Sequence, residues 1–189
     1  MTSISGQVVK QNSNALVLVL MKPTRLLRLN VGFLLKESTG YRRKFEFDAP
    51  EAQIADDLAV TDLHGDVTLT RTPQGLYAEG QLIGYVKVEC VRCLDEFPQR
   101  LSANIAELFI FPAENARPGE LVIPDEAILD LAPLVREDML LSAPIQAICR
   151  VDCKGLCPIC GANRNVENCS CVEDNVDPRF AALRALLEN

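Results

Sequence analysis

The sequence has no tryptophan, a single histidine and only 5% aromatic residues. Its longest apolar run, 15–21, is far shorter than the roughly 20 residues that span a bilayer, and no small-residue cleavage pattern follows it. We therefore expect neither a membrane span nor a signal peptide. The lone histidine, His64, precedes Gly65 and is expected to be a turn residue. The chain lacks P-loop, nucleophile-elbow and histidine–carboxylate metal motifs, so we predict that it is not an enzyme.

Acidic residues outnumber basic ones by 26 to 19, which gives a net charge of −7. This balance excludes a uniformly basic nucleic-acid binder, but residues 22–44 carry seven basic side chains against one acid, Glu37. The candidate phosphate-binding side chains in this stretch are Lys22, Arg25, Arg28, Arg42, Arg43 and Lys44. The alternative is that they form an ordinary solvated face, because charge runs are weak signals. The scarcity of aromatic side chains also argues against base stacking.

Eight cysteines are many for a chain with no export signal, and their spacing is the most informative feature of the sequence. They form four short pairs, Cys90/Cys93, Cys149/Cys153, Cys157/Cys160 and Cys169/Cys171. One tight turn directs two thiolates at a single ion, and four thiolates close a tetrahedral zinc site. The spacing therefore predicts one or two structural zinc sites built from all eight cysteines. Closed four-sulfur sites leave no open position for catalysis.

The preferred partition places Cys157, Cys160, Cys169 and Cys171 in one site, because only eight residues separate these two pairs. The other four cysteines, from 90 to 153, would then tie a strand end to the C-terminal segment. A single site with free remaining cysteines is the rival. There are four weaker alternatives. Disulfides do not suit a reducing compartment, and a thioredoxin-like pair would need a βαβ unit that the sequence does not show. A catalytic zinc would usually have histidine or carboxylate ligands, and an iron–sulfur cluster also takes four thiolates.

Periodicity predicts an α+β fold, with an antiparallel sheet core, a few helices and a C-terminal zinc-binding segment. We expect a poorly ordered extension over 1–21, the core over 22–145, and the cysteine segment with a final helix over 146–189. Predicted strands are 41–47, 66–70, 76–91 and 101–111, with a turn at 73–75 and a loop at 112–124. Predicted helices are 31–36, 128–141 and one that begins at Asp177-Pro178.

Several ordered motifs resemble one known family. They are Asn30-Val31-Gly32-Phe33-Leu34-Leu35-Lys36-Glu37-Ser38-Thr39-Gly40 before Phe45-Glu46-Phe47-Asp48, then Cys90-Val91-Arg92-Cys93-Leu94, and then Cys153-Lys154-Gly155-Leu156-Cys157-Pro158-Ile159-Cys160-Gly161-Ala162-Asn163 with Cys169, Cys171 and Asp177-Pro178-Arg179-Phe180. Together these resemble the YceD family, the large ribosomal RNA subunit accumulation proteins of bacteria and plastids. The resemblance runs from about residue 22 to the C-terminus. It departs from the family at Arg164, where leucine is more usual between two asparagines.

The resemblance implies a non-enzymatic cytoplasmic factor that supports synthesis, processing or accumulation of 23S rRNA during large-subunit biogenesis. The expected partners are 23S rRNA or its precursor and ribosomal proteins of the large subunit. An alternative is a protein-binding adaptor whose acidic surface contacts a ribosomal protein or assembly factor without touching RNA.

Overall fold

The computed structural model describes residues 25–171 of the 189-residue chain. The 3-10 helices, strands and helices in chain order are η1 (Arg25–Leu27), β1 (Arg28–Asn30), α1 (Gly32–Leu35), β2 (Arg42–Ala55), β3 (Leu58–Thr72), β4 (Gly75–Glu89), β5 (Glu96–Ile110), η2 (Ala113–Asn115), β6 (Leu121–Val122), β7 (Ile128–Asp130) and α2 (Ala132–Ser142). The predicted α+β class, with an antiparallel core, is confirmed. Residues 1–24 and 172–189, and with them the predicted extension over 1–21 and the predicted final helix, lie outside the described residues.

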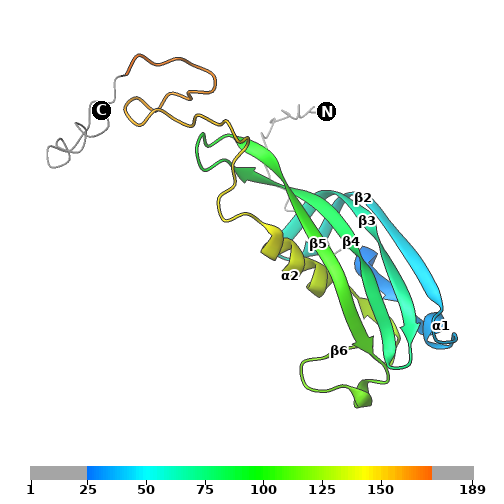
Figure 1. Ribbon diagram of the computed structural model, residues 1–189. Coiled ribbons are helices and arrows are strands. Elements are labelled where there is room, and N and C mark those ends of the chain that lie inside the picture. The colour runs from blue at the N-terminus through cyan, green and yellow to red at the C-terminus, as the bar shows by residue number, and fades with distance from the viewer. Residues whose placement is uncertain (1–24, 172–189) are drawn as a thin grey trace, which may run out of the picture.

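Four long strands, β2 to β5, form an antiparallel meander that dominates the molecule (Figure 1). The sheet order is β2-β3-β4-β5-β6, in which the short β6 joins β5 in parallel. A strand of 15 residues is roughly 50 Å long. The turn between β4 and β5 therefore lies at one end of a long sheet. The cysteine-bearing segment lies beside that turn (Figure 1).

The core lies between one face of the sheet and helix α2. Apolar side chains alternate along the strands so that one face is buried, and Leu69, Leu76 and Leu82 have no exposed surface. From the helix, Val135 and Met139 complete this core. Helix α2 contacts both β5 and β2, although β3 and β4 separate these strands in the sheet. The sheet therefore curls around the helix.

The second, two-stranded sheet pairs β1 with β7 and corrects one sequence prediction. The apolar spacing of 128–141 predicted a single helix, but Ile128–Asp130 forms β7 and the helix begins at Ala132. The long-range partner β1, which pairs Leu29 with Leu129, outweighs the local helical pattern. The predicted loop over 112–124 likewise contains β6.

The strands at 41–47, 66–70, 76–91 and 101–111 were predicted, but β2 and β3 are much longer than expected. Residues 48–65 lack clean alternation because the register shifts between Gln53 and Ala55 and again between Thr61 and His64. His64, expected in a turn, lies inside β3. Among the helices within residues 25–171, none is both long enough and apolar enough to cross a membrane.

Candidate metal centre

The turn of the β4–β5 hairpin presents the first cysteine pair. The strand register ends at Glu89, paired with Glu96, and the chain then turns through Cys90 to Asp95. The backbone N–H of Cys90 donates to the carbonyl of Asp95 at 2.9 Å, and the N–H of Leu94 donates to the carbonyl of Cys90 at 2.9 Å. Leu94 takes the left-handed conformation, with φ of 61°. This turn places both cysteines at the far end of the long hairpin.

A second, smaller turn repeats the same hydrogen-bond pattern. The pair Leu156 and Asn163 forms an isolated antiparallel bridge with the same seven-residue spacing as the last pair of β4 and β5. The N–H of Cys157 donates to the carbonyl of Ala162 at 2.8 Å, and that of Gly161 donates to the carbonyl of Cys157 at 2.9 Å. Gly161 is left-handed, with φ of 74°. Two equivalent turns thus each present a Cys-x2-Cys pair.

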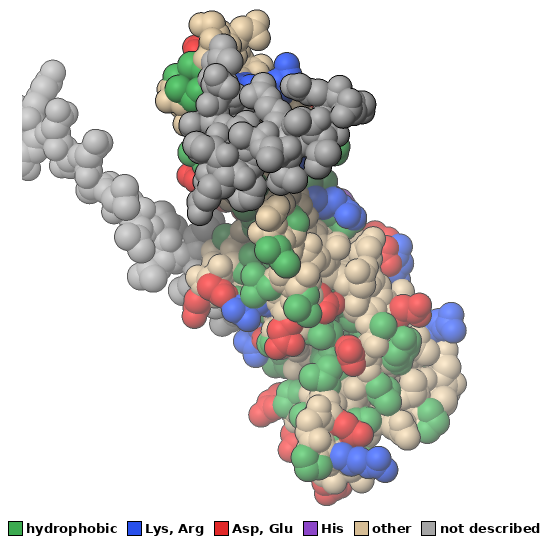
Figure 2. Space-filling view, turned by 60° about the vertical axis from the view of Figure 1, so that its left-hand side comes forward, with side chains coloured by type: hydrophobic (Ala, Val, Ile, Leu, Met, Phe, Trp, Pro, Cys, Tyr) green, Lys and Arg blue, Asp and Glu red, His purple; other side chains and the backbone are tan. Residues whose placement is uncertain are grey.

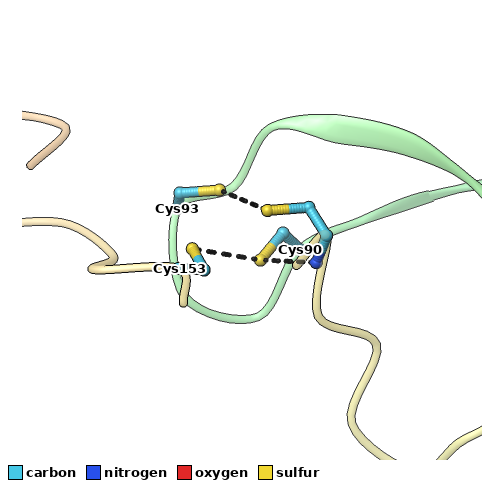
Figure 3. A group of neighbouring side chains, drawn as sticks. Cys90, Cys93 and Cys153 are labelled. Atoms are coloured by element: carbon cyan, nitrogen blue, oxygen red, sulfur yellow. Dashed lines mark hydrogen bonds between the residues drawn. The ribbon is translucent and has the colours of Figure 1, made fainter. Parts of the chain in front are cut away.

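Four cysteines from distant parts of the chain meet at the hairpin tip and form the first cluster, which consists of Cys90, Cys93, Cys149 and Cys153. Their Sγ atoms all lie within 4.8 Å of one another. The Sγ atoms of Cys90 and Cys153 are 3.9 Å apart, and those of Cys93 and Cys149 are 3.7 Å apart. Figure 3 shows Cys90, Cys93 and Cys153 converging from the hairpin turn and the later segment. The first cluster therefore joins the sheet to the chain beyond α2.

These sulfur separations fit a tetrahedral ion. With sulfurs about 2.3 Å from a central zinc, the edge of the tetrahedron is about 3.8 Å. The two Sγ–Sγ distances within the first cluster, 3.7 and 3.9 Å, lie on either side of this value. A disulfide would bring two sulfurs to about 2.05 Å. All eight cysteines are free thiols, so the first cluster has the donor set and the size of a four-thiolate site.

The second cluster consists of Cys157, Cys160, Cys169 and Cys171, whose Sγ atoms also lie within 4.8 Å of one another. The two groups are the ones that the spacing favoured. The clusters differ in exposure. In the first, only Cys149 is partly exposed and the other three cysteines are buried, whereas in the second only Cys157 is buried and Cys160 is exposed. Within residues 25–171, each cluster could hold one metal ion.

The electrostatics of each cluster favour a bound cation. Burial opposes ionisation of Cys90, yet the N–H groups directed at its sulfur, including that of Cys149 at 3.4 Å, lower its pKa to about 6. The N–H groups of Cys160 and Ile159 likewise lower the pKa of Cys157 to about 6.

The partner thiols resist ionisation. Burial raises the pKa of Cys149, and the neighbouring Cys160 sulfur raises the pKa of Cys171 to about 12. Four thiolates repel one another at this distance, and a dication offsets that repulsion. Each cluster is therefore suited to bind a cation and to release protons when it does so.

Hydrogen bonds made by Arg92, in the first cysteine turn, reach the second turn and the residues just before it. The N–H of Leu156 donates to the carbonyl of Arg92 at 2.9 Å, and the Arg92 guanidinium donates to the carbonyl of Cys153 at 3.1 Å. Gly155 is left-handed, and a Cβ there would stand 2.9 Å from the Arg92 carbonyl oxygen. Only glycine permits this close approach without displacement of the backbone. The second turn is thus packed directly on the first.

Asn165, for which the sequence predicted no role, belongs to the site. Its side-chain N–H donates to the Cys153 Sγ at 3.4 Å. Groups that hydrogen-bond to metal ligands orient these ligands and tune the affinity of the site. The signal in the sequence was the pair of asparagines, Asn163 and Asn165, shortly after the Cys-x2-Cys-Gly turn.

Two of the candidate phosphate-binding side chains have acidic partners. Arg28 lies 3.6 Å from Asp130 across the β1–β7 pair. Lys44 lies 3.3 Å from Glu46 and 3.4 Å from Asp66, and its hydrogen bonds to these two carboxylates raise its pKa. These cations are partly neutralised within the protein, which weakens their attraction for phosphate.

Of the remaining candidates, Arg42 and Arg43 do not share one face. Arg42 and Arg43 are consecutive residues of β2, so their side chains point to opposite faces of the sheet. Arg25 belongs to η1, and Lys22 lies outside the described residues. In the view of Figure 2, basic side chains are scattered among acidic ones. RNA contact by these six residues remains a prediction.

Residues 78–187 match the family model described as "Large ribosomal RNA subunit accumulation protein YceD". The matched segment runs from β4 through both cysteine clusters. No solved structure matches the chain.

Three curated relatives illustrate the similarity. The chain is 32% identical over 139 residues to an uncharacterised protein of Mycobacterium tuberculosis, a match that covers 70% of this chain and 64% of that protein. It is 32% identical over 107 residues to the uncharacterised protein YlbN of Bacillus subtilis, covering 56% of this chain and 62% of YlbN. It is 26% identical over 142 residues to a Zea mays protein named large ribosomal RNA subunit accumulation protein YCED homolog 1, chloroplastic, covering 58% and 48% of the two chains. The matches thus span less than two thirds of these relatives.

Proposed function

Because this chain belongs to the YceD family, we propose that it is a non-enzymatic factor supporting the synthesis, processing or accumulation of 23S rRNA in large-subunit biogenesis. The observation that carries the proposal is the family match over residues 78–187, which contains the whole cysteine-bearing part of the described structure. The plant relative's name states a link to large ribosomal RNA subunit accumulation. We assign to this chain the biological process in that name, accumulation of large-subunit ribosomal RNA, and no chemical reaction.

In this proposal, two zinc ions have a structural role and the eight cysteines are their ligands. The first cluster would hold one ion and fasten the segment after α2 to the β4–β5 turn, and the second cluster would hold another and shape the segment that follows. Zinc with four thiolates is coordinatively closed and contributes folding free energy. The ions therefore shape a binding surface at the end of the sheet.

The non-catalytic part of the proposal follows from the donor set. The cysteines of both clusters are grouped as metal ligands, four to each cluster. An ion held by four thiolates has no open coordination position at which a substrate or a water molecule could be activated.

The experiment is depletion of the protein in its host, with the ratio of 23S to 16S rRNA as the readout. We expect the ratio to fall and the wild-type gene to restore it. A variant with Cys90→Ser and Cys93→Ser should fail to restore it, whereas the control variant Ser102→Ala, at a partly buried position on β5 outside both clusters, should succeed. An unchanged ratio after complete depletion would contradict the proposed function.

A second candidate is a protein-binding adaptor that acts without touching RNA. The pairing of Lys44 with Glu46 and Asp66, together with the net charge of −7, favours this alternative over a phosphate-binding face. Binding to 23S rRNA fragments is measured over a salt series, with Arg42→Glu/Arg43→Glu beside the wild type. Direct RNA binding predicts a steep salt dependence and loss in the variant. Capture of ribosomal proteins with no RNA binding at low salt favours the adaptor.

A further inference from the structure

Two asparagine side chains connect the loop of the second cluster to the turn of the first. Asn163 and Asn165 both lie between Cys160 and Cys169. The side-chain N–H of Asn163 donates to the carboxylate of Asp95, in the first turn, at 2.9 Å. The side-chain carbonyl of Asn163 accepts from the backbone N–H of Asn165 at 3.0 Å and from its side-chain N–H at 2.9 Å. The first asparagine thereby fixes the second.

Asn165 uses each of its side-chain polar groups in this arrangement. Its Nδ2 donates to Asn163 and also to the Sγ of Cys153, a member of the first cluster, at 3.4 Å. Its Oδ1 accepts from the backbone N–H of Lys154 at 2.9 Å. A carboxylate of the same shape could not donate to either partner and would place a negative charge beside a thiolate. The site thus requires an amide at this position.

We propose that Asn165 is a positioning residue through which the two clusters raise each other's affinity for metal. The inference rests on the proposed metal scaffold. A metal ion in the second cluster fixes the two ends of the loop, at Cys160 and Cys169, and so holds the Asn165 amide against Cys153. A hydrogen bond to a bound thiolate strengthens its site, commonly by about 10- to 100-fold in metal affinity. By linkage, the first cluster strengthens the second by the same factor.

The coupling is measurable on the reduced full-length chain with cobalt(II) as the probe and a competing chelator. Titration of the wild type gives the overall constant for loading both clusters. Cys157→Ser/Cys160→Ser gives the constant of the first cluster alone, and Cys90→Ser/Cys93→Ser gives that of the second alone. The overall constant divided by the product of the two single constants is the coupling factor. We expect a coupling factor of about 10 to 100 in the wild type.

Asn165→Asp, which keeps the shape of the side chain and removes its donors, is expected to bring the coupling factor close to one. It should leave the constant of each isolated cluster within about threefold, whereas general damage to the fold would lower both isolated constants. Asn165→Ala should have the same effect without the added charge. The matched control is Asn168→Asp, which places the same charge on an exposed residue of the same loop and should keep the wild-type coupling.

A coupling factor of one in the wild type, or an unchanged factor in both Asn165 variants, would overturn the inference while the metal scaffold stands. Loss of coupling in Asn168→Asp equal to that in Asn165→Asp would also overturn it, because charge alone would then explain the effect. Failure of the wild type to take up cobalt at either cluster would instead refute the metal scaffold. The two failures are therefore distinguishable.

Discussion

Removal of the metal with a strong chelator should unfold residues 149–171 and leave the sheet intact. The segment has few apolar contacts of its own. Apart from cysteines, the apolar side chains packed on the first cluster are Phe97 and Ile148, which are only partly buried and precede the segment. The sheet and α2 share a separate core that extends from Leu27 to Met139 and includes no cysteine. Loss of metal therefore removes the support of one part of the molecule only.

The magnitude follows from the number of residues to be ordered. Fixing the 23 backbones of 149–171 at about 1 kcal/mol each, the lower end of the usual range, costs about 23 kcal/mol. The two proposed zinc ions would supply about 20 to 32 kcal/mol. The two quantities are similar, so with the two proposed ions bound we expect the segment to be ordered, and without them we expect it to lose that order.

The assay is hydrogen exchange followed by mass spectrometry, before and after chelation. Amides of 149–171 should lose protection, and those of 76–88 in β4 should keep it. Chelator presaturated with zinc is the control, and added zinc should restore protection. Undiminished protection of 149–171 in fully metal-free protein would refute the reasoning, because another interaction would then have to order the segment.

Three further outcomes are expected. Gly161→Ala should lower the free energy of unfolding of the metal-bound protein by about 1 to 2 kcal/mol, because alanine is strained in the left-handed backbone conformation. Gly155→Ala should lower it by more, because the added Cβ would also meet a backbone oxygen. Guanidinium unfolding of the zinc-loaded protein measures both changes. Met139 is fully buried in the core, so Met139→Ala should lower the free energy of unfolding of the metal-free sheet by about 2 to 5 kcal/mol, measured by urea unfolding. The affinity for cobalt, measured by titration, should stay unchanged. The pKa values of Cys93 and Cys149 are raised above the usual thiol value, so metal binding at pH 7.5 should release at least two protons from the first cluster, and the metal affinity should rise by about 100-fold per pH unit. Calorimetry in buffers of different ionisation enthalpy counts these protons, and a release of fewer than two would contradict the assignment.

The sequence predicted those features whose cause is local. The pairs Cys90/Cys93 and Cys157/Cys160 were visible as turns, because a Cys-x2-Cys spacing is itself the geometry of a tight loop. The short helix at 31–36 and the turn at 73–75 were likewise predicted from neighbouring residues. Strand β7 was missed because its pairing partner, β1, lies about 100 residues away in the chain.

The side chains that surround the sulfurs could not be identified from the sequence. Asn165 reaches Cys153 because the loop folds back over the first turn. The basic stretch over 22–44 looks continuous in the sequence, but the fold separates its side chains. Arg42 and Arg43 point to opposite faces of the sheet, and Lys44 is paired with acidic side chains.

By itself, the sequence determined the α+β class, the cysteine pairs and the family, because each depends on the order and spacing of nearby residues. The spacing also favoured a site that joins Cys149 and Cys153 to Cys90 and Cys93, but only the tertiary structure decided between this partition and its rival and showed that the two cysteine turns lie in contact. The reason is physical. A long hairpin and a helix of fixed length set where the chain after α2 arrives, and that position depends on packing across the whole sheet.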